Sequence, residues 1–388
     1  MSEWKKVKLG EITSIKTGKL DSNASVSNGI YPFFTCDPST LSIDKWAYDT
    51  EAILLAGNNA SGNYTAKYYK GKFNAYQRTY IIETLNPQFA SVRFMAYAMN
   101  QQLQLLKVMS TGSTTKFLTM KMLTQLTINL PQIEIQHRIA TILSRYDSLI
   151  ENYQKQIKLL EEAAQRLYKE WFVDLRFPGH ENTNIVDGEP EGWEKKKLCE
   201  LFSFVRGKSY TSKELSDEGT IMVNLKNIQS FGGYKSDVEK HFIGTFKEEQ
   251  TLMKGDLIMG VTDMTQERRL VGSVALIPDF KETATFSMDL IKLISFKLPN
   301  IYLYCAMRYG DVSRQIAPLA NGVNVLHLKP EAISNIEMVV ASDSIIEKFV
   351  SYTSKTIESI LSLQSQLRLL TEARDRLLPK LMSGEIEI

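Results

Sequence analysis

The stretch that decides the fold is WKKVKLGE at Trp4–Glu11, because it returns as WEKKKLCE at Trp193–Glu200. The offset between the two copies is 189 residues, and the same offset relates Gly18-Lys19 to Gly207-Lys208. Self-similarity at a fixed offset indicates one structural unit used twice. The chain is therefore interpreted as two copies of one structural unit.

A second repeated stretch closes each copy. KLLEEA at 158–163 returns as RLLTEA at 368–373, now at an offset of 210 residues. Because the offset grows from 189 to 210, the second copy holds a longer insert than the first. Two copies of one scaffold with different inserts predict a protein that reads two different things at a fixed separation.

Length and composition are those of an ordinary globular protein. The 388 residues allow two or three domains with cores of their own. A net charge of +2 neither requires nor excludes a polyanionic partner, because local patches matter more than the sum. Three widely spaced cysteines, no apolar leader and no run of about 18 uncharged apolar residues predict a cytoplasmic protein without disulfides or membrane spans.

Two segments, residues 1–130 and 193–341, have the pattern of mixed α/β domains. Each contains short apolar or β-branched runs bounded by Gly, Asn or Pro, which indicate strands. Each also contains a run whose apolar residues follow helical spacing. The expected strands are 52–56, 78–82, 126–130, 255–259 and 290–294, and the expected helices are 89–108 and 300–315.

Two other segments, 132–176 and 343–382, predict long helices, because good helix formers dominate them and Gly is absent. Their apolar residues repeat at spacings of three and four, which indicates a coiled-coil seam. We expect the two seams to pack as one antiparallel pair, with Pro379 limiting the second helix. The alternative is that each helix docks on its own domain as an ordinary core helix. The seam residues are Ile150, Tyr153, Ile157, Leu160, Ala164, Leu167 and Trp171 in the first helix, and Ile360, Leu363, Leu367, Leu370, Arg374, Leu377 and Leu381 in the second.

These patterns predict an α+β protein with a pseudo-two-fold internal repeat. Two mixed α/β domains are separated by two long helices that pack as an antiparallel coiled coil. The expected division is a first mixed domain over 1–130, a central helical segment over 131–178, a linker over 179–192, a second mixed domain over 193–341 and a C-terminal helical segment over 342–388.

The order of these parts carries a resemblance to a known family. GSTTKFL at Gly112–Leu118 precedes INLPQIEIQHRIA at Ile128–Ala140, and the long helix follows. The second copy keeps a related turn, GVNVLHL at Gly322–Leu328, but has Ser342–Ser344 where the first has its proline boundary. This arrangement, repeated over the whole chain, resembles the specificity subunit of type I restriction–modification systems. The family often shows Pro-x-x-Glu-Gln-x-x-Ile-Ala at the boundary, and this chain inserts Ile135 between the acid and the amide.

The resemblance implies a function as well as a fold. The two mixed domains would be target recognition domains, each reading one half of an asymmetric, bipartite site in double-stranded DNA. The helices would set the gap between the half-sites and dock two methyltransferase subunits, and restriction subunits would complete the complex. The specificity subunit of such systems carries no catalytic residues.

The residues themselves predict no catalytic centre, metal site or cofactor. The four histidines are scattered without ligand spacing, and no glycine-rich phosphate-binding motif occurs. The nearest match to a DNA amino-methyltransferase motif is Asn86–Phe89, which has Gln88 in place of the second proline and is interpreted as a turn. Asp279–Glu282 stands without the cluster of carboxylates that a magnesium-dependent nuclease needs near its lysine. We therefore expect a protein that is not an enzyme.

Candidate DNA contacts in the first half lie in polar loops, since phosphates supply affinity and base edges supply specificity. The polar stretch from Gly57 to Lys67 directly follows an expected strand, and its asparagines can pair with adenine. An ordinary solvated loop is the alternative for this stretch, a structural turn for 111–116, and an ion pair with a neighbouring acid for Arg78. The candidates are Lys19, Asn58, Asn59, Asn63, Lys67, Arg78, Ser113, Thr114, Thr115 and Lys116.

In the second half the loop after the strand at 255–259 corresponds roughly to Gly57–Lys67. Lys208 occupies the position of Lys19 in the first copy, and either lysine could simply be solvated. The candidates are Lys208, Asn224, Lys226, Asn227, Gln266, Arg268, Arg269, Asn321 and Asn324.

The repeated aromatic residues have a different interpretation. Trp4 and Trp193 are expected to anchor the first strand of each domain to its core. Trp171-Phe172 could mark a docking surface for a methyltransferase subunit or could pack against the linker. The competing function for the whole chain is a coiled-coil adaptor whose mixed domains bind proteins and not DNA.

Overall fold

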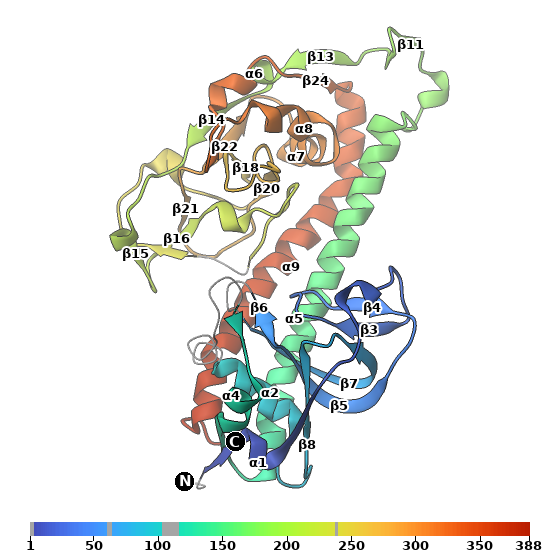
Figure 1. The fold of residues 1–388 in the computed structure, drawn as a ribbon. Coiled ribbons are helices and arrows are strands. Elements are labelled where there is room, and N and C mark those ends of the chain that lie inside the picture. Colours follow the sequence, from blue (N-terminus) through green and yellow to red (C-terminus); the bar gives the residue numbers. More distant parts are fainter. Residues whose placement is uncertain (1–3, 60–63, 103–115, 237–239) are drawn as a thin grey trace. The chain divides into compact units, whose positions relative to one another are not determined.

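The computed structural model describes residues 4–59, 64–102, 116–236 and 240–388 (Figure 1). The chain divides into two compact units. Unit 1 consists of Met1–Asp147 and Ala373–Ile388, and unit 2 consists of Ser148–Glu372. Both long helices contribute to both units, so the five-part division at 1–130, 131–178, 179–192, 193–341 and 342–388 stays a prediction.

Unit 1 is built on a six-stranded sheet in the order β2-β8-β5-β7-β3-β4. Its neighbouring strands are antiparallel except for β3 and β7. In β5, Ile53 and Leu55 enter one core while Ala52 and Leu54 enter another. Burial on both faces explains why the second half of this strand, residues 52–56, is a continuous apolar run. The strands are β2 (Thr13–Thr17), β3 (Tyr31–Phe34), β4 (Leu41–Ile43), β5 (Tyr48–Ala56), β7 (Ala66–Ala75) and β8 (Thr79–Thr84).

Separate strands and short helices complete unit 1. The first strand pairs antiparallel with β10, so residues far apart in sequence close the domain. The ring of Trp4 lies 6.2 Å from that of Phe94 in the domain core, which confirms its predicted anchoring role. The elements are β1 (Lys5–Lys8), α1 (Leu9–Ile12), β6 (Asn58–Asn59), α2 (Val92–Gln101), β9 (Lys116–Phe117), α4 (Met120–Gln125) and β10 (Thr127–Leu130).

Unit 2 contains two four-stranded sheets, in the orders β14-β22-β18-β20 and β15-β17-β16-β21. The predicted linker contains a short hairpin of β11 and β12. The strands are β11 (Ile185–Val186), β12 (Glu189–Pro190), β13 (Glu194–Lys197), β14 (Phe202–Arg206), β15 (Leu215–Ser216), β16 (Thr220–Val223), β17 (Lys240–Phe242), β18 (Leu257–Gly260), β19 (Thr262–Asp263), β20 (Val274–Leu276), β21 (Ala284–Phe286), β22 (Leu290–Ser295), β23 (Leu326–His327) and β24 (Glu337–Val340).

The helices of unit 2 include the expected segment 300–315, which is broken into two at Gly310. A Cβ atom at Gly310 would lie 2.4 Å from the Ala306 carbonyl oxygen, so the turn depends on glycine. The short helices are α6 (Leu198–Leu201), α7 (Asn300–Tyr309) and α8 (Val312–Ile316). Single 3₁₀ turns occur at Ser22–Ala24, His180–Asn182, Ser212–Glu214, Leu225–Asn227, Glu248–Gln250, Ala317–Leu319 and Pro330–Ile333.

The two units share a strand order that extends beyond the repeated sequence. β2-β8-β5-β7 in unit 1 matches β14-β22-β18-β20 in unit 2, and β13 pairs with β24 as β1 pairs with β10. The single long strand β7 corresponds to two strands, β20 and β21, and β16 lies parallel to β21 as β3 lies parallel to β7. The inserts therefore differ in length and sequence but not in basic topology.

The two long helices are α5 (Ile133–Tyr168), which ends in a π turn at Lys169–Val173, and α9 (Asp343–Ser383). In unit 2 the ring of Trp171 lies 5.7 Å from that of Phe349. In unit 1 Arg374 forms a 3.1 Å ion pair with Asp147. The later residue of α5, Trp171, thus meets the earlier residue of α9, Phe349, and Asp147 meets Arg374. This order confirms that the two helices pair antiparallel.

The long helices also pack on the mixed domains. Packing as an antiparallel pair and docking as core helices therefore both occur. Seam residues Ile157 and Ile360 share one core with Leu303 of α7. A charged residue can occupy the seam at Arg374 because Asp147 forms an ion pair with it. The prediction that Pro379 limits the second helix is wrong, because α9 continues to Ser383 with Leu381 and Met382 buried in unit 1. No helix in the described residues is long and apolar enough to cross a membrane.

Candidate nucleic-acid interface

In unit 1 several sequence-predicted contacts meet at the ends of β2, β5 and β8. Gly18 donates its amide hydrogen to the Thr79 carbonyl at 3.1 Å, and Gly57 donates to the Arg78 carbonyl at 2.8 Å. These bonds bring Lys19, Arg78 and Asn58 to one edge of the sheet. The side chains of Lys19 and Arg78 are exposed, and no acid pairs with Arg78 among the described residues. We name this edge the unit 1 rim.

Two short strands, β6 and β9, meet at the unit 1 rim. β6 pairs antiparallel with β9, and Leu118 donates its amide to the Gly57 carbonyl at 2.8 Å. Strand pairing thus places the main chain of Asn59 beside that of Lys116. Asn63, Ser113, Thr114 and Thr115 lie outside the described residues.

A loop that the sequence did not single out, Thr35–Thr40, also lies at the unit 1 rim. The thiol of Cys36 donates to Asn58 Oδ1 at 2.6 Å. The ammonium of Lys67 donates to the Pro38 carbonyl at 2.6 Å and to Thr40 Oγ1 at 3.3 Å. Burial lowers the pKa of Lys67, which Asp37 partly offsets. Lys67 therefore holds this loop in place.

The same main-chain arrangement recurs in unit 2. β19 pairs with β23, and Leu328 donates to the Val261 carbonyl at 2.8 Å. This bond corresponds to the one between Leu118 and Gly57, so the predicted equivalence of the two polar loops is confirmed. We name the edge formed by 262–269, 321–327 and Lys208 the unit 2 rim. Lys208 is included because its carbonyl accepts a hydrogen bond from the Met288 amide, and the carbonyl of the next residue, Asp289, accepts one from the Val261 amide.

The loop at 262–269 is folded by a buried carboxylate. Asp263 is 1% exposed and accepts from the Thr265 amide at 2.8 Å and the Leu270 amide at 2.7 Å. Gln266 Nε2 donates to the Val323 carbonyl at 2.9 Å, which ties this loop to the next one. Arg268, Arg269 and Gln266 therefore stand on an ordered loop and not on a free one.

The remaining unit 2 candidates divide into exposed and buried residues. Lys226, Asn321 and Asn324 are exposed, and Lys208 is half-buried. Asn224 and Asn227 are 5% and 0% exposed, and each uses its side chain to cap the 3₁₀ turn between them. Asn227 also donates to the Lys235 carbonyl at 3.1 Å. Their polar atoms serve folding, so the interpretation of Asn224 and Asn227 as DNA contacts is corrected.

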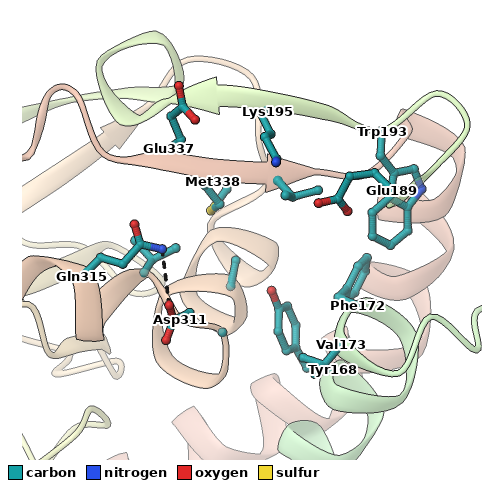
Figure 2. Close-up of a pocket in the computed structure, with 14 residues that line it drawn as sticks. Tyr168, Phe172, Val173, Glu189, Trp193, Lys195, Asp311, Gln315, Glu337 and Met338 are labelled. Atoms are coloured by element: carbon teal, nitrogen blue, oxygen red, sulfur yellow. Dashed lines mark hydrogen bonds between the residues drawn. The ribbon is translucent and has the colours of Figure 1, made fainter. Parts of the chain in front are cut away.

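A pocket of about 530 Å³ lies in unit 2 at the end of α5 (Figure 2). Tyr168, Phe172 and Trp193 form an aromatic wall, and Glu189, Asp311 and Glu337 are among the polar lining residues. Phe172 is half-buried, with its ring 5.7 Å from that of Trp193.

The aromatic pair at the end of α5 differs from a simple exposed docking site. Trp171 is 5% exposed and packs between Phe349 and Tyr352, so it belongs to the core. Phe177 of the linker packs on Trp193, whose ring lies 5.3 Å away. Packing against the linker and the second helix therefore accounts for most of this aromatic cluster.

In the described residues the rims offer hydrogen-bond donors, amides and cations, with one ion pair between Arg269 and Glu267 on the unit 2 rim. Within the described residues no group of three or more His, Cys, Asp or Glu side chains is arranged to hold a metal ion. Such a surface can bind phosphates and base edges.

Comparisons with known proteins agree with this arrangement. A family model described as the type I restriction modification DNA specificity domain matches residues 1–162. The type I restriction enzyme EcoDI specificity subunit from Escherichia coli is 37% identical over 164 residues, which cover 42% of this chain and 36% of that protein. The MjaIX specificity subunit from Methanocaldococcus jannaschii is 29% identical over 291 residues, which cover 73% of this chain and 66% of that protein. The matches thus span less than two thirds of either relative.

A solved structure extends the likeness to the whole chain. The type I restriction–modification S subunit from M. genitalium has a TM-score of 0.65 with 19% sequence identity, over 98% of this chain and 96% of that one. At this identity the likeness concerns the fold.

Proposed function

We propose that this chain is a member of the type I restriction–modification specificity family, and that it is the non-catalytic subunit that recognises the DNA target. Each target recognition domain, over 1–130 and 193–341, reads one half of an asymmetric, bipartite site. The helical segments at 131–178 and 342–388 set the gap between the half-sites and dock two methyltransferase subunits. Restriction subunits join this core in the full complex, which acts in the cytoplasm.

The observation that carries the proposal is the repeated construction of the two rims. In each unit one main-chain hydrogen bond, Leu118 to Gly57 or Leu328 to Val261, joins two polar loops that are distant in sequence. The main-chain arrangement is the same in both rims, but the side chains on it differ. Different side chains on equivalent main-chain arrangements are what recognition of two different half-sites requires.

Charge and side-chain type on the rims also support DNA as the ligand. Lys19, Arg78 and Asn58 lie together on the unit 1 rim, and Gln266, Arg268 and Arg269 lie on the unit 2 rim. Arginine can bond guanine with two hydrogen bonds, and asparagine or glutamine can bond adenine. Lysine supplies phosphate contacts that do not depend on sequence.

The proposal is tested by mapping methylated sites in cells that carry the methyltransferase subunit with and without this chain. We expect two specified half-sites separated by a fixed gap, and we expect Arg78→Ala to relax or abolish recognition in one half only. The matched control is Lys45→Ala, which removes an exposed positive charge of unit 1 from the loop between β4 and β5. A methylation pattern that does not depend on this chain, or DNA binding by the complex that is insensitive to salt, would refute the proposal.

A further inference from the structure

Phe231 stands exposed on the unit 2 surface in a strained backbone conformation. Its side chain is 68% exposed and its φ angle is 66°. A bulky residue with positive φ is a real outlier, and such strain persists only where the surroundings enforce it. An exposed phenyl ring contributes little to folding. Strain and exposure together therefore indicate that this ring is placed for contact with a ligand.

The surroundings of Phe231 enforce its position. Phe231 donates its amide to the Arg269 carbonyl at 2.9 Å, and the following glycines donate to Gln229 at 2.9 Å and Val274 at 2.8 Å. Isolated bridge pairing of Ile228 with Tyr234 closes the base of the hairpin. The ring is therefore presented by a rigid turn.

A part-buried ion pair supports the same turn. Arg308 binds both carboxylate oxygens of Glu161, at 2.9 and 3.0 Å. A Cβ atom at Gly232 would lie 2.9 Å from Arg308 Cγ, and one at Gly233 would lie 2.8 Å from Arg308 Nη2. Because both residues are glycines, the turn packs directly against the side chain of Arg308. This contact fixes the position of Phe231.

Arginine side chains line the same pocket as the phenyl ring. Phe231 lines a pocket of about 600 Å³ together with Arg268, Arg269 and Arg314. Arg268 has φ of 53°, and its Nε is buried without a hydrogen-bond partner. Among the described residues no carboxylate pairs with Arg268 or Arg314, whereas Arg269 pairs with Glu267 at 2.5 Å. An aromatic ring beside unpaired arginines suits a polyanion that also offers stacking surfaces.

The corresponding loop of unit 1 has no exposed aromatic residue. Thr35–Thr40 follows β3 as the Phe231 hairpin follows β16, and both lie against the polar loop of their rim. The unit 1 loop carries Cys36, Asp37 and Pro38 and no aromatic residue. The difference lies in the part of the chain where the two copies have diverged.

We propose that Phe231 is an aromatic wedge that inserts between base pairs of the DNA held by unit 2, with Arg268 and Arg314 binding the flanking phosphates. Apolar side chains inserted at a base step partly unstack it and kink the duplex, and the protein then reads how easily that step deforms. This inference rests on the proposed function and adds a second means of recognition, confined to one half-site.

The test uses the complex of this chain with its methyltransferase subunit and a DNA that contains both half-sites. Dyes at the two DNA ends report bending, and 2-aminopurine placed at successive positions of the unit 2 half-site reports unstacking. Wild-type complex should bend the DNA and raise the fluorescence at one step. Phe231→Ala should remove both signals and weaken binding roughly tenfold, whereas Phe231→Leu should keep part of each.

Two further variants separate a wedge from a structural role. Phe231→Gly should relieve the backbone strain and raise the melting temperature while it abolishes unstacking. Phe296→Ala removes an aromatic ring that is 55% exposed elsewhere in unit 2, and it should leave bending unchanged. Arg268→Ala and Arg314→Ala should each reduce the salt dependence of binding, which Phe231→Ala should not.

The outcomes distinguish failure of the wedge from failure of DNA recognition. Unchanged bending and fluorescence in Phe231→Ala, with wild-type affinity, would overturn the wedge alone. Loss of methyltransferase association in Phe231→Ala with normal DNA distortion would assign the ring to a protein interface and overturn the wedge as well. A wild-type complex without salt-dependent DNA binding would overturn the proposed function and the wedge together.

Discussion

At Gly18 and Gly207 a side chain has no room. A Cβ atom would lie 2.1 Å from the Ala75 carbonyl oxygen at Gly18 and 2.0 Å from the Ser287 carbonyl oxygen at Gly207. The obstacle is backbone in both cases, so it cannot rotate away. We expect Gly18→Ala to lower the free energy of unfolding by about 1–3 kcal/mol or more, measured by urea unfolding.

The neighbouring lysine provides the control for this substitution. Lys19 is exposed and forms no ion pair within the described part of the chain, so Lys19→Ala should leave the unfolding curve unchanged. It should instead reduce the salt dependence of DNA binding by about one phosphate contact. Equal destabilisation by both variants would contradict this division between a structural glycine and a functional lysine.

Cys305 is a residue whose chemistry reports on folding. It is fully buried in α7, and burial raises the pKa of its thiol to about 12, although Arg308 opposes the shift. Because the thiolate is the reactive form, Cys305 should resist alkylation at pH 8 in the folded protein. Cys199 is exposed. Mass spectrometry of alkylated peptides should find Cys199 modified in native protein and Cys305 modified only in denaturant.

Which polar residues are available for contact was harder to predict than which segments form polar loops. Asn224 and Asn227 have the composition of a recognition loop, yet they form the cap of a buried turn. Asparagine serves both roles with the same amide, so its sequence pattern cannot separate them. Phe231 was missed because one aromatic residue before two glycines has no distinctive pattern until its exposure and φ angle are known.

At the scale of elements, the long helices present apolar residues to solvent as well as to the seam. Leu159 on α5 is 65% exposed, and Leu369 on α9 is 52% exposed. If these helices dock methyltransferase subunits, Leu159→Glu should weaken that association by roughly tenfold, because a desolvated carboxylate costs at least 1.4 kcal/mol at such an interface. Pull-down titration with the methyltransferase subunit measures the change.

The matched control for this variant lies in unit 1. Leu85 follows β8 and is 63% exposed, so Leu85→Glu changes the same residue type at similar exposure away from the helices. Its association with the methyltransferase subunit should remain that of wild type. An equal loss for both variants would mean that added charge, and not a helix surface, explains the effect.

Elements were predictable where one physical pattern dominated. The seam of α5 and α9 follows from apolar spacing alone, and β5 follows from a run that is buried on both faces. The helix expected at 300–315 is interrupted at Gly310, where the close approach of the Ala306 carbonyl excludes a side chain. The division of β7 into β20 and β21 in the second copy depends on long-range pairing, which periodicity does not report.

At the scale of the whole molecule, the helices are proposed to measure the gap in the DNA site. A matched deletion is best placed at the boundary of the two units, at Ser148–Glu151 and Leu369–Glu372. Deletion within 160–163 would remove Glu161 and leave Arg308 buried without its partner, which typically costs about 3–5 kcal/mol. Four residues shorten each helix by about 6 Å.

We expect this double deletion to shorten the unspecified gap and to leave both half-site sequences unchanged. Methylation mapping of the variant in cells gives the gap and the half-sites together. The double deletion removes the same length from both helices, whereas deletion from α5 alone should abolish recognition. Altered half-site sequences in the double deletion would show that the helices do not act as a spacer.

The sequence by itself determined the repeat, the helix seams and the α+β class, and it singled out the polar loops that we propose read DNA. Each of these follows from local periodicity or from self-similarity, which survive without knowledge of the fold. The tertiary structure decided which polar side chains are free. Strand pairs β6–β9 and β19–β23 bring distant loops together, Asp263 and Lys67 are used to hold loops, and Phe231 is left exposed. Burial and hydrogen bonding between distant segments set these roles, and no local pattern encodes them.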